Sequence, residues 1–461
     1  MATIAENLTL LKSTKAGIKA AIEAKGVSNV GDKFSDYPAK IASIPTGGST
    51  SGVSQWTGTV DRAGLTELGW STTDIDNFQA NVRWYDWQDP DYTVVDADKS
   101  ITDISQYKYN KDVRYAKMLD TSQVTDMQYM FSDCTRLTSI PTLDTSQVSN
   151  MQYIFDGCSS LTTIPTLDTS QVTNMESMFR TCTSLTSIPA LNTSQVTNMG
   201  YTFNGCSRLT SIPALDTSKV TTMGGLFNNC TSLTSIPALN TSQVTSMDSM
   251  FWGCTSLTSI PTLDTSQVTN MSSVFNNCTS LTTIPALNTS KVTNMYRMFY
   301  GCSSLTSIPT LDTSQVTSMY SMFNNCTSLT TIPALNTSQV TSMSQMFSGC
   351  SSLTSIESID FSSCTSTYSM FPSWNNYSKL TSIHVTGSIS FSWTSGGFSS
   401  IPNLDFNSIK SILEAMNRCT NPETAKTMSF KATMTDQDSQ LTNLVSECNG
   451  KGWTITGLTI N

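Results

Sequence analysis

Charged residues are scarce in this sequence, and long apolar runs are missing. Only 13% of the 461 residues are charged, and the formal net charge is -9. Binding of DNA or RNA needs clustered Lys and Arg to neutralise phosphates, so we expect no nucleic-acid partner. The apolar runs span a few residues, whereas a membrane helix needs about 20, so no membrane insertion is expected. The segment that begins Met1-Ala-Thr-Ile-Ala-Glu-Asn lacks the basic and apolar stretches of a secretory signal, which favours assembly in a cytoplasm.

Residues for catalysis are also few. His384 is the only histidine, so a Ser-His-Asp or Cys-His arrangement would have to use it. No Cys-x-x-Cys pair, Walker motif or Gly-x-Gly-x-x-Gly motif occurs, so zinc sites of the usual spacing and nucleotide-binding loops are not indicated. Paired carboxylates that cleave a glycoside remain open, because acids distant in sequence can converge in space. The preferred interpretation is a non-enzymatic protein without a cofactor.

Thirteen cysteines are present, and ten of them recur every 24 residues. Each of the ten therefore belongs to a repeat unit and not to a pair. A buried thiol behaves as a small apolar side chain, so we interpret the series as a reduced row in the core. Disulfides between adjacent turns are the alternative, because stacking in register brings neighbours to roughly 5 Å. The series comprises Cys134, Cys158, Cys182, Cys206, Cys230, Cys254, Cys278, Cys302, Cys326 and Cys350.

A 24-residue unit accounts for this period. It opens with Leu-[Asp/Asn]-Thr-Ser-x-Val, closes with Phe-x-x-Cys-x-x-Leu-Thr-[Ser/Thr]-Ile, and occurs ten times without insertion from Leu119 onward. A degenerate eleventh copy runs from Ile359 to Ile383 with three extra residues. One unit has too few apolar positions to close a core, so the units are expected to stack into one apolar column. In the first copy these positions are Leu119, Val124, Met127, Met130, Phe131, Cys134, Leu137 and Ile140.

Each unit divides into three segments. Residues 137–140, Leu-Thr-Ser-Ile, predict a short strand of a parallel sheet that stops at Pro141, because proline donates no hydrogen bond to the ladder. Residues 120–122, Asp-Thr-Ser, predict a turn cap. The apolar spacing over residues 124–134 predicts a short helical turn. The expected fold class is therefore a leucine-rich-repeat solenoid over residues 119–383, with a parallel β-sheet and short helical turns.

The second residue of the unit alternates between Asp and Asn. This interchange suits a side chain that caps a turn, which needs an acceptor oxygen and no charge. A ladder of calcium ions along Asp120, Asp144 and Asp168 is the alternative. The preferred interpretation contains no metal.

The repeated block Val-Thr-x-Met-x-x-Met-Phe-x-x-Cys-x-x-Leu-Thr-x-Ile-Pro resembles the BspA-like leucine-rich repeats of bacterial surface proteins. The resemblance covers residues 119 to about 383, and its motif recurs ten times. It implies a solenoid and a role in adhesion to host proteins or cell surfaces.

The N-terminal flank divides into a module at 1–45 and a linker at 46–55. Apolar residues at Ile4, Leu8, Leu11, Ile18 and Ile22 predict a helix that packs against a partner or against copies of itself. We expect a homo-oligomer, with a trimer favoured; packing against residues 34–41 is the alternative. The opening residues resemble N-terminal modules of phage structural and fibre proteins. The segment Leu-Gly-Trp-Ser-Thr-Thr-Asp-Ile-Asp-Asn-Phe, from Leu68, is similar to one that precedes BspA-like repeats in phages of gut bacteria.

Two further segments are expected to close the ends of the solenoid. Residues 56–118 carry four tryptophans and predict a capping domain, with a sugar-binding platform as the alternative. Residues 384–461 predict an α/β cap, with helices over 405–416 and 435–450 and strands over 426–430 and 453–460. This tail resembles the segment that closes other such repeat proteins.

Positions that vary between copies are the candidate binding surface. They follow the first Met of the unit or precede its Cys, and other positions are nearly fixed by packing or turns, so these slots are interpreted as free for recognition. Aromatic residues and Arg are typical of binding hot spots; scattered surface aromatics without a ligand are the alternative. The candidate residues are Trp252, Tyr296, Arg297, Tyr300, Arg180 and Tyr201.

Three functions are compatible with these features. The preferred one is a phage virion fibre or head decoration, exposed on the virion surface, that attaches to a capsid or tail protein through its N-terminus. Its repeats would bind a bacterial surface or gut glycan or protein. A bacterial surface or secreted adhesin is the second function, and a polysaccharide depolymerase the third.

Overall fold

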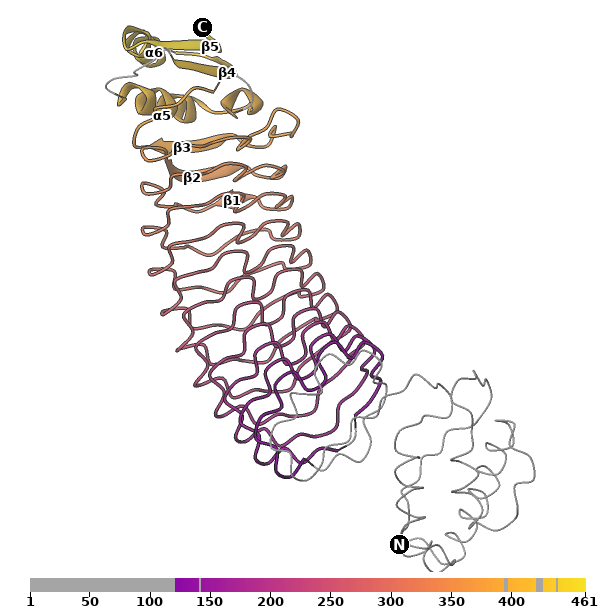
Figure 1. The fold of residues 1–461 in the computed structure, drawn as a ribbon. Helices are drawn as coiled ribbons and strands as arrows, with labels where there is room; N and C mark the ends of the chain where they lie inside the picture. The colour runs from indigo at the N-terminus through magenta and orange to yellow at the C-terminus, as the bar shows by residue number, and fades with distance from the viewer. Residues whose placement is uncertain (1–120, 141, 394–396, 420–425, 437) are drawn as a thin grey trace, which may run out of the picture.

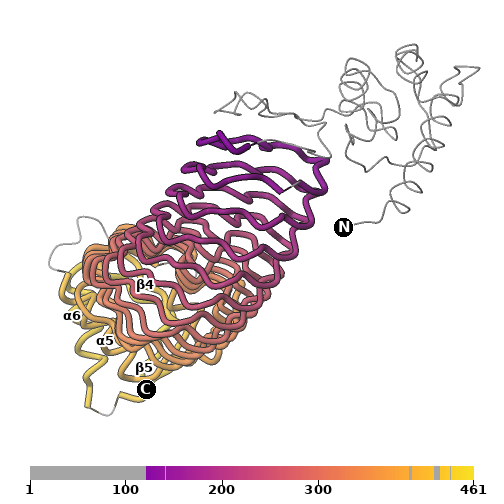
Figure 2. Tube along the Cα trace, turned by 90° about the horizontal axis from the view of Figure 1, so that it is seen from below, coloured from indigo at the N-terminus to yellow at the C-terminus, as the bar shows by residue number. Residues whose placement is uncertain are grey.

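The protein is a solenoid of stacked coils. A computed structural model describes residues 121–461 except 141, 394–396, 420–425 and 437. One coil is formed per 24 residues, and the coils follow one another in a curved column that ends in the C-terminal helices and strands (Figure 1). Seen from one end, each coil is a flattened loop lying on the next (Figure 2). The modules expected at 1–45, 46–55 and 56–118 lie outside the described residues.

The apolar column predicted from the repeat is confirmed. In the first described coil Val124, Met127, Met130 and Phe131 are completely buried, and the equivalent positions of later coils are buried too. The phenylalanine of each coil stacks on the next from Phe131 to Phe371, with ring centroids 5.4–5.9 Å apart and planes within 20° of parallel. Each ring from Phe155 to Phe347 thus has an aromatic neighbour on both faces, at separations typical of favourable ring pairs.

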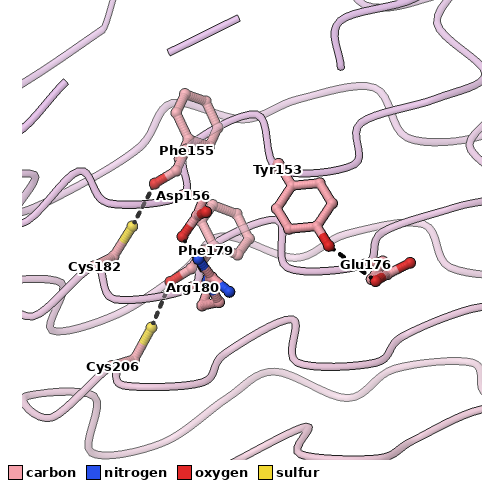
Figure 3. Close-up of polar contacts among 8 residues, drawn as sticks. All are labelled: Tyr153, Phe155, Asp156, Glu176, Phe179, Arg180, Cys182 and Cys206. Carbon is pink, nitrogen blue, oxygen red and sulfur yellow. Dashed lines mark hydrogen bonds and ion pairs between the residues drawn. The ribbon is translucent and has the colours of Figure 1, made fainter. Parts of the chain in front are cut away.

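The cysteine row is reduced and buried, as the sequence predicts. Each thiol also has a partner that the sequence does not reveal. Cys182 donates its Sγ–H to the carbonyl oxygen of Phe155 at 3.1 Å, and eight other cysteines of the series repeat this bond to the phenylalanine 27 residues earlier at 3.0–3.1 Å (Figure 3). The thiol row therefore connects coils as well as filling space.

The strand predicted at 137–140 is wrong for most coils. Within the described residues, strands on this side form only in the last coils: β1 (Thr331–Ile332), β2 (Ser355–Asp360) and β3 (Ser382–Thr386), which pair in parallel. The length of these strands follows the residue after the Ile of the unit. β1 ends at Ile332, directly before Pro333, whereas β2 and β3 continue past this point, where Glu357 and His384 replace the proline.

The helical turn predicted over 124–134 is also wrong. The segment consists of consecutive turns whose N–H groups point alternately along and within the coil. Met127, Tyr129, Phe131 and Asp133 donate to carbonyls of the next coil at 2.6–3.0 Å, whereas Met130 donates to Met127 within its own coil. Tyr129 and Asp133 have φ near +60°, so the chain cannot continue as an α-helix. We call this stretch, residues 126–134 and its equivalents every 24 residues, the turn segment.

The turn caps predicted at the Asp/Asn position are confirmed. The side-chain oxygen of Asp168 accepts a hydrogen bond from the N–H of Ser170 at 2.9 Å, and Asn192 caps Ser194 in the same way. This bond lowers the pKa of the Asp168 carboxyl. The following threonine points inward: Thr169 donates its hydroxyl to the carbonyl oxygen of Asn192 in the next coil at 2.8 Å.

Tyr377 ends the phenylalanine and cysteine columns. With the three extra residues counted, it occupies the cysteine position of the eleventh copy. Its ring meets Phe371 edge-on at 5.4 Å, and its hydroxyl donates to the carbonyl oxygen of Phe347 at 3.0 Å. That carbonyl would otherwise have received the next thiol. The larger side chain fills the space at the end of the column and satisfies its last acceptor.

The C-terminal segment covers the open edge of β3. It comprises η3 (Gly397–Ser400), α5 (Phe406–Asn417), β4 (Lys426–Met434), α6 (Gln440–Gly450) and β5 (Trp453–Ile460), with β4 and β5 paired in parallel. The hydroxyls of Ser408 and Ser411 on α5 accept hydrogen bonds from the N–H groups of Ile383 and Val385 on β3. Edge N–H groups that would template further strands are thereby occupied.

Neither α5 nor α6 is long and apolar enough to cross a membrane, and these are the α-helices of the described part of the chain.

The cysteine column predicts a loss of stability at alkaline pH. Burial raises the pKa of Cys206 and Cys254 from 9.0 to about 12, so these thiols stay protonated in the folded protein while the unfolded chain ionises them. Their contribution is fully present below pH 9 and is lost as the pH rises to about 12. Each such thiol lowers the free energy of unfolding by about 1.4 kcal/mol per pH unit in that window.

We therefore expect the Tm to be constant near neutral pH and to fall steeply above about pH 9, where unfolded-state thiols begin to ionise. Thiolate absorbance should rise together with unfolding. Ionisation of most thiols near pH 9 in a protein that stays folded would contradict the buried column.

Candidate binding face

The variable positions of the turn segments line one continuous face along the column. In each coil two of them follow the first Met, at positions equivalent to 128 and 129, and two precede the Cys, at positions equivalent to 132 and 133. Larger side chains at these positions, such as Tyr201 and Trp252, are exposed, whereas small ones, such as Ser177 and Asn276, are buried. We call this surface the turn face. Inter-coil hydrogen bonds at Tyr129, Phe131 and Asp133 fix its backbone, so residues 24 apart in sequence become direct neighbours.

The interpretation that all four positions are free to vary is wrong for the position equivalent to 133. The position equivalent to 133 has a positive φ in every described coil, between 55° and 82°. Side chains rarely adopt this left-handed backbone, which glycine, Asn and Asp tolerate best. Nine of the ten residues found there are of these types: Asp133, Gly157, Thr181, Gly205, Asn229, Gly253, Asn277, Gly301, Asn325 and Gly349. The left-handed backbone therefore favours these residue types here, although the position equivalent to 129 has a similar φ and accepts residues such as Tyr129 and Arg297.

The first coils of the turn face are joined by paired polar side chains. Tyr153 stacks on Tyr129 with ring centroids 4.7 Å apart. Its hydroxyl donates to Glu176 at 3.0 Å (Figure 3). Arg180 forms an ion pair with Asp156 at 2.9 Å. Burial raises the pKa of the Asp156 carboxyl, although Arg180 lowers it, and the guanidinium also lies 5.9 Å from the Tyr153 ring. The charge of Arg180, one of the candidate residues, is thus neutralised by Asp156 of the same chain.

Glycines interrupt the turn face in the next coils. Gly200 and Gly224 occupy the position equivalent to 128, and Gly225 follows. The ring of Tyr201 lies over Gly225, where an added β-carbon would be only 2.3 Å from the ring carbon Cε1. Tyr201 is 39% exposed, and burial together with Asp248 and Glu176 raises the pKa of its hydroxyl. Tyr201, one of the candidate residues, thus presents an aromatic ring that packs on the backbone of the next coil.

Three candidate residues gather further along. The guanidinium of Arg297 lies 5.1 Å from the ring centre of Tyr296 and 5.3 Å from that of Tyr300. Tyr320 completes the group: its ring stacks on Tyr296 at 5.4 Å and lies 5.7 Å from the guanidinium. We call Tyr296, Arg297, Tyr300 and Tyr320 the tyrosine–arginine cluster. Trp252, 39% exposed, occupies the position of Tyr300 two coils earlier.

The structure therefore groups Tyr296, Arg297 and Tyr300 as expected, and leaves Trp252, Arg180 and Tyr201 as separate points on the same face. Tyr320 was missing from the candidates, although its position 24 residues after Tyr296 was a usable signal.

No catalytic or metal-binding arrangement is apparent in the described coils and C-terminal segment. Within them, no group of three or more His, Cys, Asp or Glu residues could hold a metal ion. The calcium alternative required free carboxylates, but Asp144 and Asp168 cap turns through Ser146 and Ser170; Asp120 lies outside the described residues. His384 is exposed on β3. The turn face presents aromatic rings, amides and one cation without an ionic partner. These groups are suited to binding a ligand.

Comparison with known proteins gives one family and several repeat structures. A family model described as "Mycoplasma protein of unknown function, DUF285" matches residues 99–212, 206–307 and 279–383, more than half of the chain. A search of curated proteins gives no match.

Solved structures similar to the chain include leucine-rich repeat proteins of two bacteria. That of T. pallidum is 17% identical, with a TM-score of 0.27, and the match covers 41% of this chain and 76% of that one. That of Eubacterium ventriosum is also 17% identical, with a TM-score of 0.31, and covers 62% of this chain and 92% of that one.

The packing of Tyr201 on Gly225 yields a prediction. In Gly225→Ala the new methyl group would collide with the ring and would occupy a backbone with a φ of +61°, so the free energy of unfolding should fall by about 1–2 kcal/mol. Gly450→Ala is the control, because nothing lies within 4 Å of its added carbon. Thermal melting compares the two. Equal effects would show that the ring does not rest on Gly225.

Proposed function

Since the chain belongs to the family described as Mycoplasma protein of unknown function, DUF285, and forms a solenoid with a continuous turn face, we propose that it is a non-enzymatic adhesion protein. It is a structural component of a phage virion, a head or tail fibre or decoration. The solenoid presents the turn face to glycans or proteins of the host cell or the gut.

The gathering of Tyr296, Arg297 and Tyr300 at outward positions carries this proposal. Large aromatic residues and Arg contribute most of the free energy in typical binding surfaces. They occur here in a unit whose other outward positions are mostly Ser, Thr, Asn and Gln. Two more aromatic side chains, Tyr201 and Trp252, are exposed on the same face. The rigid stack holds them at fixed spacing, which reduces the entropy lost on binding.

Attachment to the virion rests on residues 1–45, through a capsid or tail protein and with a trimer as the favoured assembly. The apolar seam from Ile4 to Ile22 and the resemblance to phage fibre modules support this part. Several copies on one particle would add avidity to a weak individual contact. Virions assemble in the bacterial cytoplasm and would carry the solenoid on their surface.

Mass spectrometry of purified virions tests the location. We expect the chain to co-purify with the capsid and tail proteins through a density gradient. Recovery from the bacterial surface or medium, with none in virions, would instead favour a bacterial adhesin.

Replacement of two aromatic residues tests the binding role. In the double variant Trp252→Ala/Tyr300→Ala, adsorption of the purified full chain to cells that the unaltered protein binds should fall at least about tenfold, since hot-spot truncations cost about 2 kcal/mol or more. The matched comparison is Trp374→Ala/Tyr368→Ala, which removes the same residue types from the eleventh copy, at the far end of the turn face, where both are more than 70% exposed. Undiminished adsorption by the first variant, or an equal loss in the comparison variant, would place the binding site elsewhere.

A further inference from the structure

The two arginines that contact tyrosine rings on the turn face differ in their ionic partners. Arg180 is paired with Asp156 at 2.9 Å. The guanidinium of Arg297 lies against three tyrosine rings, and within the described residues it has neither an ion pair nor a hydrogen bond. Its Nε atom is buried without an acceptor.

The sequence around the cluster explains the missing partner. Across the four turn segments 270–278, 294–302, 318–326 and 342–350, Arg297 is the only charged residue. The nearest acid in a turn segment along the chain is Asp248, two coils before Arg297. A net charge of -9 leaves many carboxylates elsewhere, yet this stretch of the face holds a single cation and none of them.

A buried guanidinium N–H without an acceptor is unfavourable, and the three rings compensate only part of the lost hydration. Nε is closed to a ligand from outside, but the two terminal nitrogens of the guanidinium are not among the buried atoms. An oxyanion supplied from outside would pair with them, because the planar guanidinium binds carboxylate or phosphate through two parallel hydrogen bonds. The hydroxyls of Tyr296 and Tyr300 form no hydrogen bond to other described residues, so they are also available. Tyr320 is held in place by its hydroxyl bond to Gln345 at 3.1 Å.

We propose that the tyrosine–arginine cluster binds an acidic sugar, a pyranose ring that carries a carboxylate. The carboxylate pairs with the guanidinium of Arg297, and the apolar face of the sugar lies against the tyrosine rings. This inference rests on the proposed adhesion function and adds the ligand class. Because the chain as a whole is acidic, attraction is local to the cluster, and binding should weaken as salt concentration rises.

Binding of the full chain to defined oligosaccharides tests the proposal. The probes are an oligogalacturonate, a neutral glucose oligosaccharide of equal length and a glycerol phosphate oligomer, measured by calorimetry at neutral pH. We expect the oligogalacturonate to bind at least tenfold more tightly than the neutral probe. A preference for the glycerol phosphate oligomer would overturn the assignment of a carboxylated sugar.

Three variants separate charge from structure. Arg297→Gln should lower the affinity for oligogalacturonate at least tenfold, and Arg297→Lys, which keeps the charge without the planar fork, at least threefold. Arg208→Gln is the matched control: it removes the same charge from an exposed position outside the turn face and should change affinity less than twofold. Melting curves establish that each variant is folded.

Unchanged affinity in a folded Arg297→Gln protein would overturn the proposal. So would equal binding of the acidic and neutral probes while cell adsorption still depends on Trp252 and Tyr300; in that case the adhesion function would stand and only the ligand class would be wrong. Adsorption that is independent of Trp252 and Tyr300 would instead remove the adhesion site on which this inference rests.

Discussion

Each coil of this solenoid is held to the next by backbone hydrogen bonds from its turn segment and by the stacked phenylalanine ring beneath them. The N–H groups of Met127, Tyr129 and Phe131 all donate to the following coil, and the thiol of Cys158 donates back to the carbonyl of Phe131. An insertion in the turn segment of a unit with a regular unit on each side would break this register. The strict 24-residue period of the first ten copies is the sequence counterpart of that constraint.

Because of the same constraint, equivalent positions of successive units are stacked in columns. A residue type that recurs at one position becomes a ladder, such as the buried threonines typified by Thr169 or the turn caps typified by Asp168. A residue type that changes at one position becomes a local feature on an otherwise uniform surface. Tyr296, Arg297 and Tyr320 are such a feature, because adjacent coils bring them within ring-contact distance.

The repeat period and the buried positions could be predicted from the sequence, because burial favours apolar side chains. Val124, Phe131 and Cys134 differ in chemistry from the outward residues, so the core was visible without coordinates. The path of the backbone could not be predicted in the same way. The spacing of apolar residues over 124–134 suits both a helix and a series of turns that bury the same side chains.

The signal that distinguishes the two backbone paths was the alternation of Gly and Asn before the Cys, as at Gly253 and Asn277, which reports a positive φ. The continuation of β2 beyond Ile356 could likewise have been inferred by comparing Pro333 with Glu357.

The candidate site was predictable in composition and less so in geometry. Arg180 and Arg297 are similar in sequence context, each with aromatic residues nearby, yet only the structure shows that Asp156 neutralises one and no described acid neutralises the other. Contacts between side chains of adjacent coils depend on the path of the backbone. An alternative path would have placed different side chains next to each other. The predictions for residues 1–118 stay predictions.

Stacking of the coils through their turn segments is the claim on which the face and its ligand depend, and hydrogen exchange of the native full chain tests it most directly. The account predicts slow exchange for the amides that join coils, including Phe155, Phe179 and Phe227, at a similar level along the column, because each donates to a carbonyl of the next coil at 2.9–3.0 Å. Rapid exchange at these amides in a protein that is otherwise folded would contradict the stack, and with it the alignment of side chains on the turn face.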